Sequence, residues 1–276
     1  MTATAPARTF DPYATAAPAS ARFFLHHLNP LSKIAAVLPA MLLLVFVRDL
    51  ATPAALLALG YAVVLVGARL SRRTVLLLFV AVPIGVAVIG LGFSIWVDAA
   101  GVDDTVPLLQ LGGWTLYSGA LRIGFATGLR LAAILALALI GGLTTTGPDL
   151  VRASVQQLHV PYRIGYTALA AYRFVPRFGY ELSVIRAAHR VRGHHGGRGP
   201  LARIARAWGY VVPLLAGAIR HAERVALAMD ARAFGAHPTR TERHLVPFRT
   251  RDVVFIAAFI AASAAVFITL QPWQQH

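Results

Sequence analysis

The stretch Thr74–Val97 reads TVLLLFVAVPIGVAVIGLGFSIWV and contains no charged residue. A helix needs about 20 apolar residues to cross the hydrocarbon core of a bilayer, and this stretch supplies them without interruption. A membrane-spanning β-strand would instead show alternating polarity over about ten residues. The stretch therefore predicts a transmembrane helix and places the chain among integral membrane proteins.

Apolar residues are gathered in similar runs along the rest of the chain. Four more charge-free runs cover Ile34–Val47, Ala51–Ala68, Leu131–Pro148 and Val253–His276. Of the 276 residues, 57% are hydrophobic and only 13% are charged, whereas a soluble domain carries about 25% charged residues. The shorter runs need Lys33, Arg48 and Arg130 to extend toward the lipid headgroups. We predict an all-α polytopic membrane protein with about five transmembrane helices and a cytoplasmic domain of long amphipathic helices.

The placement of arginine predicts the orientation of these helices. Arg69, Arg72 and Arg73 lie in one short loop, which the positive-inside rule assigns to the cytoplasm. The loop Asp98–Trp114 has three aspartates and no Lys or Arg, so it is expected outside. The net charge of +15 then indicates contact with anionic membrane lipid and no nucleic acid.

The chain divides by composition into four expected parts. Residues 1–25 lack an apolar segment and are expected to form a disordered cytoplasmic tail, and residues 26–147 a membrane domain of four helices. Residues 148–250 are expected to form a cytoplasmic domain, because Asp149–Arg251 holds 17 of the 26 basic residues. Residues 251–276 form the last transmembrane helix and a short outer tail. The mixed segment Tyr117–Leu129 either extends the fourth helix or lies at the outer interface.

Apolar residues of the basic region recur every three or four positions, which predicts two long helices. Pro176 and Pro213 are expected to bend these helices without ending them, and Gly193–Pro200 to join them as a loop. A shorter helix is expected to start at Pro148–Asp149. Such a helical pair is either an anchor lying on the membrane surface or a docking platform for a soluble subunit, and composition does not decide between them.

A series of short motifs bears on this choice. It comprises LTTTGPDL at Leu143–Leu150, YRFVP at Tyr172–Pro176, AHRVRG at Ala188–Gly193, VPLL at Val212–Leu215 and ALAMDARAFG at Ala226–Gly235. In order and spacing the series resembles the transmembrane T component (EcfT/CbiQ-like) of energy-coupling-factor (ECF) importers. In that family a short Ala-Arg-Gly-like motif lies near the end of each of two long coupling helices.

The resemblance implies a non-catalytic permease subunit that works in a complex. Two ABC-type ATPase subunits would hydrolyse ATP, and a separate small membrane (S) subunit would bind a vitamin or transition-metal ion. The location would be the cytoplasmic membrane of a bacterium or archaeon, with the N-terminus inside. The implied ATPase-coupling residues are Val191, Arg192, Gly193, Ala231, Arg232 and Ala233.

Arginine suits such a coupling role, because its planar guanidinium is always charged and can bind a carboxylate with two hydrogen bonds. Gly193 is expected to end the first coupling helix, and the small neighbours Ala231 and Ala233 would let the second helix end enter a narrow groove. Both motifs depart from the family pattern in a small flanking residue, which weakens the assignment to a subtype more than the assignment of function.

Other candidate sites are weaker. His194 and His195 adjoin in a Gly-rich loop without nearby carboxylates, so a flexible loop is favoured over a metal site. Gly124 and Gly128 form a GxxxG pattern that indicates close helix packing. Arg130 is expected to anchor at the interface. The Thr144–Thr146 run is expected to end a helix, with hydroxyls bonding to free backbone groups.

The sequence has no phosphate-binding GxxxxGK[ST] loop, HExxH or GxSxG motif, so no catalytic residue, metal ligand or cofactor is expected. It has no cysteine either, which excludes disulfides and thiolate metal sites. The alternative function is a membrane-embedded enzyme of lipid metabolism that binds phosphate head groups, although the paired carboxylates that a divalent metal needs are missing. A complete secondary carrier would need more helices and an internal repeat.

Overall fold

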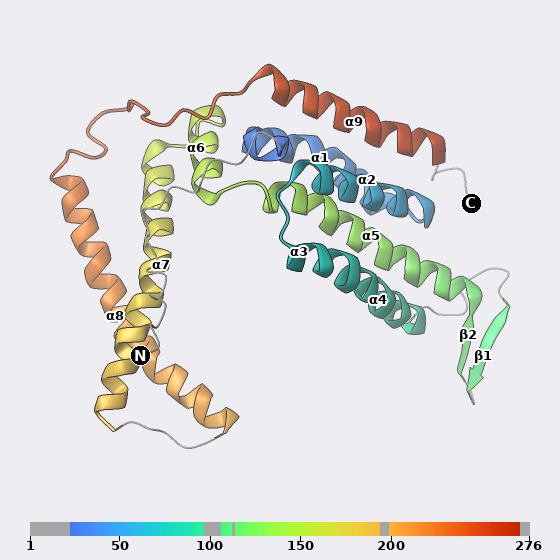
Figure 1. Ribbon diagram of the computed structural model, residues 1–276, viewed down its shortest axis with the longest axis horizontal. Coiled ribbons are helices and arrows are strands. Elements are labelled where there is room, and N and C mark those ends of the chain that lie inside the picture. The colour runs from blue at the N-terminus through green and yellow to red at the C-terminus, as the bar shows by residue number, and fades with distance from the viewer. Residues whose placement is uncertain (1–22, 97–105, 112–113, 194–198, 271–276) are drawn as a thin grey trace, which may run out of the picture. The chain divides into compact units, whose positions relative to one another are not determined.

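A computed structural model of the chain describes residues 23–96, 106–111, 114–193 and 199–270. The described residues form two compact units (Figure 1). One unit, here called the bundle, comprises residues 23–153 and 246–270. The other, here called the helix pair after its two main helices, comprises Ser154–Leu245.

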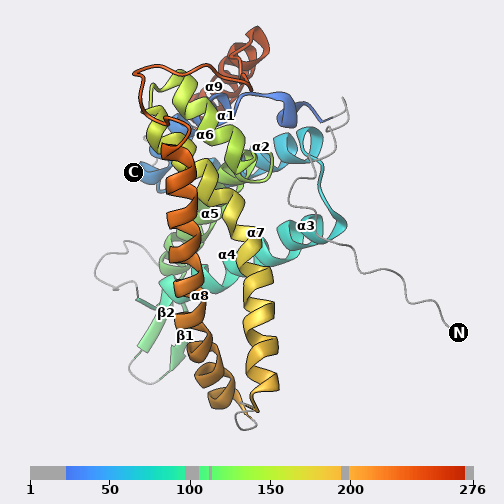
Figure 2. The ribbon, with the colours of Figure 1, turned by 90° about the vertical axis from the view of Figure 1, so that its left-hand side faces the viewer.

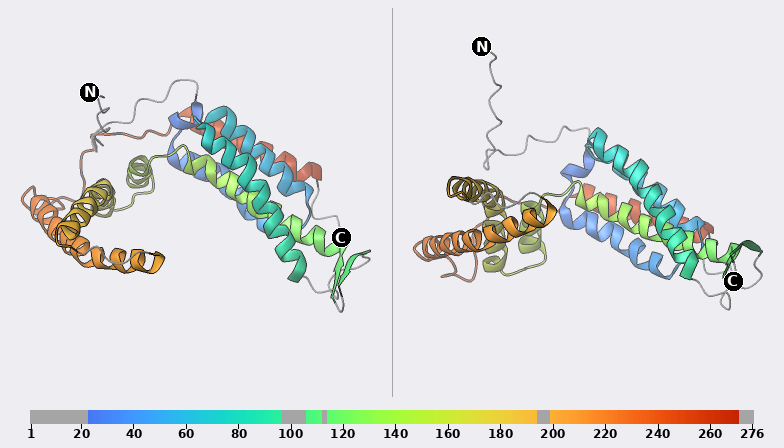
Figure 3. Two further views of the ribbon diagram at one scale, coloured as in Figure 1. Left: turned by 60° about the horizontal axis from the view of Figure 1, so that its bottom comes forward. Right: turned by 90° about the horizontal axis from the view of Figure 1, so that it is seen from below.

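The bundle consists of apolar helices that lie side by side (Figure 3). Its helical elements are η1 (Phe24–His27), α1 (Pro30–Phe46), α2 (Ala51–Gly67), α3 (Arg72–Leu76), the π-helical η2 (Leu77–Ala81), α4 (Val82–Trp96), α5 (Ser118–Gly142) and α9 (Thr250–Leu270). Three continuous helical stretches are long and apolar enough to cross a membrane, namely Arg72–Trp96, Ser118–Gly142 and Thr250–Leu270. Helices α1 and α2 have 17 residues each, the lower limit for a span. The predicted all-α membrane fold is confirmed.

Helix α5 extends from Ser118 to Gly142, which answers the question left open for Tyr117–Leu129: that segment extends the fourth helix. The sequence analysis missed a short antiparallel hairpin before α5, formed by β1 (Pro107–Leu111) and β2 (Trp114–Tyr117). The three aspartates of the expected outer loop lie outside the described residues.

Close packing of α4 on α5 depends on the predicted GxxxG pattern. A Cβ atom at Gly124 would lie 2.2 Å from both the Gly90 carbonyl oxygen and Ser94 Oγ. At Gly128 it would lie 2.8 Å from the Val86 carbonyl oxygen. These two glycines therefore let the backbones of α4 and α5 approach each other directly, as expected for small residues in a membrane bundle.

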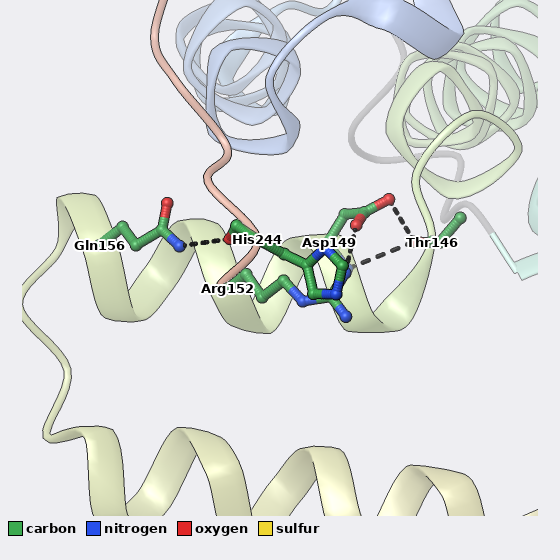
Figure 4. Close-up of polar contacts among 5 residues, drawn as sticks. All are labelled: Thr146, Asp149, Arg152, Gln156 and His244. Atoms are coloured by element: carbon green, nitrogen blue, oxygen red, sulfur yellow. Dashed lines mark hydrogen bonds and ion pairs between the residues drawn. The ribbon is translucent and has the colours of Figure 1, made fainter. Parts of the chain in front are cut away.

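Helix α6 (Gly147–Gln157) starts one residue before the predicted position. Thr146 and Asp149 cap its first turn: Thr146 Oγ1 donates to Asp149 Oδ2 (2.6 Å) and accepts from the Asp149 backbone N–H (3.3 Å), as Figure 4 shows. Arg152 forms an ion pair with the same carboxylate at 3.0 Å. The Thr146 hydroxyl thus satisfies one of the free N–H groups of the helix start, that of Asp149. Near the end of α6, Gln156 Nε2 donates to the His244 carbonyl oxygen (2.9 Å).

The helix pair consists mainly of α7 (Tyr162–Val191) and α8 (Pro200–Asp230), which are antiparallel and cross in the view of Figure 1. Both helices continue through their internal prolines, as predicted for Pro176 and Pro213. Their contacts include stacking of Phe174 on His221, with ring centroids 4.1 Å apart. A Cβ atom on Gly217 of α8 would lie 3.0 Å from Glu181 Oε2 of α7, so the helices pass close together there.

Candidate partner-binding site

The first predicted group of site residues lies at the C-terminal end of α7. The helix ends at Val191, and the backbone N–H groups of Arg192 and Gly193 donate to the Ala188 and Arg190 carbonyls at 3.1 Å. Gly193 has a left-handed φ of +74°, which ends the helix as expected. Val191 is 90% exposed, and the next two residues are exposed as well. An apolar side chain and a cation thus project together from the helix end.

The second group follows the C-terminal end of α8. The helix ends at Asp230, so Arg232 lies in the turn after it and not in its last turn. The N–H groups of Ala233 and Phe234 donate to the Asp230 and Met229 carbonyls at 2.9 and 3.0 Å. All three of Ala231, Arg232 and Ala233 are exposed.

The two ends share a backbone feature that the sequence did not disclose. Ala233 has a φ of +55°, in the left-handed region that favours glycine, and Gly193 occupies the same place in the first group. In both groups an exposed arginine therefore directly precedes a left-handed residue. The alanine that departs from the Ala-Arg-Gly pattern keeps the backbone conformation of the glycine, so the departure changes the residue but not the turn.

The structure does not bring the two groups together. The C-terminal end of α8 lies beside the N-terminal end of α7, where the Tyr162 and Phe234 rings meet at 5.8 Å. The first group lies at the opposite end of α7, a helix of 30 residues, and Figure 2 shows both ends. At 1.5 Å per residue the two groups are separated by about 45 Å. They form two separate exposed ends on one pair of helices.

The surface of α7 and α8 between these ends exposes apolar side chains among charged ones. Among the described residues of α7 and α8, Gly165 is the only buried one. The stripe predicted on α8 is exposed where it begins, with Ile204 at 65%, Trp208 at 77% and Leu215 at 58%. Large apolar side chains exposed beside charged ones are typical of surfaces that contact a partner or membrane headgroups.

A buried polar cluster in the bundle was missed by the sequence analysis. Lys33 is 1% exposed, and its Nζ donates to the Thr144 carbonyl (2.9 Å), Thr144 Oγ1 (3.1 Å) and Thr145 Oγ1 (3.2 Å). The expectation that Lys33 extends to the headgroups is therefore wrong, because the end of α5 offers it three acceptors. The expected role of the threonine run at a helix end is confirmed, since Thr144 Oγ1 also donates to the Ile140 carbonyl.

Asp252, in the first turn of α9, is the second buried charge of this cluster, at 1% exposed. Its carboxylate accepts from the Asn29 and Arg249 backbone N–H groups, both at 2.7 Å, and from Ser32 Oγ at 3.3 Å. It thereby fixes the start of α9 to the start of α1. The sequence signal for this cluster was a charged residue near the start of each apolar helix, Lys33 in α1 and Asp252 in α9. The signal does not reveal their partners Thr144 and Asn29, which lie more than 100 residues away in the sequence.

Arg130 lies in the middle of α5, where its Nη2 donates to the Val47 carbonyl at the end of α1. Within the described part of the chain no group of three or more His, Asp or Glu residues could hold a metal ion. His194 and His195 lie outside the described residues. The described residues thus form two exposed helix ends on the helix pair and a packed bundle with a buried polar cluster.

Comparisons with known proteins agree with this picture. A family model described as CbiQ, cobalt transport protein, matches residues 21–243. The chain is 29% identical over 252 residues to the energy-coupling factor transporter transmembrane protein EcfT of Bacillus selenitireducens, covering 88% of this chain and 91% of that protein. It is 26% identical over 253 residues to EcfT of Staphylococcus aureus, covering 89% and 92%.

A third similar protein has a different length. The putative ABC transporter ATP-binding protein BL0043 of Bifidobacterium longum is 30% identical over 252 residues. That alignment covers 88% of this chain but only 31% of the longer protein. The region similar to this chain is thus one part of a larger polypeptide there.

Proposed function

The chain belongs to the cobalt transport protein family CbiQ, and from this premise we propose that it is the transmembrane coupling (T) subunit of an ECF-type importer. In this role it transmits the conformational change of two ATPase subunits to a separate small membrane subunit that binds the substrate. The substrate is a vitamin or a transition-metal ion. The chain itself is not catalytic, and its partners hydrolyse ATP.

The observation that carries the proposal is the pair of similar helix ends on the helix pair. Each presents an exposed arginine before a left-handed residue, about 45 Å apart. Two equivalent ends suit two copies of one kind of partner, and a guanidinium suits a carboxylate in a partner groove. The similarity to part of an ABC transporter ATP-binding protein supports a partner of that class.

The proposed topology follows from the arginine distribution. Residues 148–250 form a coupling domain in the cytoplasm, where the N-terminus also lies, and the basic surface contacts anionic lipid. A lipid-metabolism enzyme is the less favoured candidate, because no carboxylate cluster suited to a divalent metal occurs in the described parts of the chain.

The test is the double variant Arg192→Glu/Arg232→Glu. Each change replaces an attractive contact by repulsion, and losing one partner of a buried charge pair costs about 2–5 kcal/mol. With about 1.4 kcal/mol per tenfold, the two changes weaken ATPase assembly by several orders of magnitude if they act independently. We expect the chain to insert normally, lose the ATPases on co-purification and lose substrate uptake.

The control carries the same change of charge outside both groups, as Arg224→Glu/Arg243→Glu. Both arginines are exposed. Arg240, which the sequence alone would offer as a control, is unsuitable because its guanidinium stacks on Tyr166 at 4.3 Å. Normal assembly and uptake by the Arg192/Arg232 variant would mean that these arginines are ordinary surface charges.

A further inference from the structure

We infer that Arg240 is a positioning residue for Arg232. Together with Tyr162, Arg163 and Tyr166 it clamps the segment after α8 onto the first turns of α7, so that the second binding end is held in place before any partner arrives. The inference rests on the proposed function, since it concerns how one of the two ATPase-binding ends is prepared.

The first part of this clamp involves the start of α7 and three of the four residues that follow the second group. The Tyr162 ring meets the Phe234 ring edge to face, with centroids 5.8 Å apart, and Tyr162 Oη donates to the His237 carbonyl (2.5 Å). Arg163 Nη2 donates to the Gly235 carbonyl. Three contacts thus fix the chain within five residues of Arg232.

The second part of the clamp is the Arg240 guanidinium, which lies close to two aromatic rings. The Arg240 guanidinium lies 4.3 Å from the centroid of Tyr166 and 5.6 Å from that of Phe234. The Tyr166 hydroxyl donates to the Glu242 carboxylate. Cation–π contacts of this length are attractive, so Arg240 ties Phe234 to α7 through Tyr166.

The backbone leaves little freedom between this clamp and Arg232. Ala233 and Gly235 both have left-handed φ values, +55° and +89°. A Cβ atom at Gly235 would lie 3.0 Å from Arg163 Nε, so the chain passes close to the arginine there. Only Ala233 separates Arg232 from Phe234, and the position of the clamp therefore fixes the turn that presents Arg232.

The first binding end is different. In the described residues up to Gly193, the side chains of Val191 and Arg192 are exposed, and the last ring contact of α7 is between His189 and Tyr210 at 5.2 Å. A binding segment whose backbone is ordered in advance loses less entropy on binding. Within the described residues only the second end has such a clamp, although both ends share one local turn.

The experiment uses the absence of cysteine from the chain. Ala188→Cys and Ala228→Cys, in separate proteins, place one thiol four residues before Arg192 and one four residues before Arg232. Both alanines are exposed. Each thiol carries a benzophenone photo-cross-linker, and the yield of cross-links to added purified ATPase subunits is measured with and without Arg240→Met.

We expect Arg240→Met to lower the cross-linking at position 228 by about three- to tenfold at a half-saturating ATPase concentration and to leave position 188 unchanged. Tyr166→Leu should lower it at least as much, because it removes the same ring and also the hydroxyl that donates to Glu242, and adding Arg240→Met to it should change the yield little further. Arg240→Lys, which keeps the cation, should restore most of the yield. Arg243→Met is the matched control and should change neither yield.

An equal loss at both positions would mean general destabilisation, and no loss at position 228 would mean that the clamp does not prepare Arg232. Either result overturns the inference. If neither thiol cross-links to ATPase in the unaltered chain, the proposed function fails instead.

Discussion

The bundle and the helix pair both expose apolar side chains, but the exposure has a different meaning in each. Thr74–Val97 has no charge at all, and Leu76, Phe79 and Val88 of this stretch are at least half exposed. The helix pair, by contrast, interleaves its exposed apolar residues with fourteen arginines and four acidic residues between Ser154 and Leu245. Lipid tails suit the first surface, whereas a mixed surface suits a protein partner or headgroups.

Their interiors differ as well. The bundle buries Lys33 and Asp252 among specific acceptors and donors, and packs α4 on α5 through glycine. Among the described residues of α7 and α8 only Gly165 is buried. Changes inside the bundle should therefore cost folding stability, whereas changes in the helix pair should cost little stability and act on partner binding. Four substitutions, two in the bundle and two in the helix pair, test this contrast.

The largest effect is expected from Gly124→Leu in the bundle. Even its Cβ atom would lie 2.2 Å from the Gly90 carbonyl oxygen, a backbone atom that cannot move without separating α4 from α5. Overpacking typically costs about 1–3 kcal/mol, and a backbone clash belongs at or above the upper end. We expect little monodisperse protein on size-exclusion chromatography in detergent and an early thermal transition.

Gly141→Leu is the control in the same helix, because a Cβ atom at Gly141 has no neighbour within 4 Å. It should purify as the unaltered chain does. Equal behaviour of the two variants would show that α4 and α5 are not in the close contact described above.

Much of this contrast could be predicted from the sequence. The five apolar runs, the proline-containing long helices and the start of α6 follow from local patterns, because charge, periodicity and capping residues act within a few residues. The β-hairpin was missed although Gly112 and Gly113 separate its strands, a pair typical of two-residue hairpin turns.

The candidate site was predictable only in its outline. The motifs predicted Arg192 and Arg232 as site residues. They did not predict the left-handed φ of Ala233, because alanine rarely adopts that backbone conformation. Lys33 and Arg240 depend on partners 111 and 74 residues away in the sequence, so no local pattern reveals that one is buried and the other stacked. Long-range packing decides the roles of such side chains.

A smaller effect is expected from Lys33→Met. The substitution keeps the apolar length of the side chain but leaves the Thr144 carbonyl and two threonine hydroxyls without their donor. A buried polar group that loses its partner costs about 1–3 kcal/mol. The thermal transition of the purified chain in detergent should fall measurably.

Arg48→Met is the matched control at the other end of α1, where the arginine is exposed. Its transition should stay close to that of the unaltered chain. Equal transitions for the two variants would indicate that Lys33 lies at the headgroups and would remove the main polar contact between α1 and α5.

The smallest effects are expected at the two binding ends, where Ala233→Gly and Gly193→Ala exchange the residues that adopt a left-handed φ. An L-residue pays about 1–2 kcal/mol in that region, and glycine loses about 0.5–1 kcal/mol more in backbone entropy on folding. Subtracting the entropy cost of glycine from the conformational cost of alanine leaves glycine favoured in this turn by about 0.5–1 kcal/mol. Ala233→Gly should therefore stabilise its turn, and Gly193→Ala should destabilise its own. Both residues are exposed, so global stability should hardly change, and amide hydrogen exchange measured by mass spectrometry is the suitable local probe.

Exchange of the Phe234 amide, which donates to the Met229 carbonyl at 3.0 Å, should slow about two- to fivefold in Ala233→Gly. Exchange of the Arg192 amide, which donates to the Ala188 carbonyl, should quicken by a similar factor in Gly193→Ala. A change of the same sign in both variants would show that the two ends do not share one backbone turn, and the structural equivalence of the two arginines would be lost.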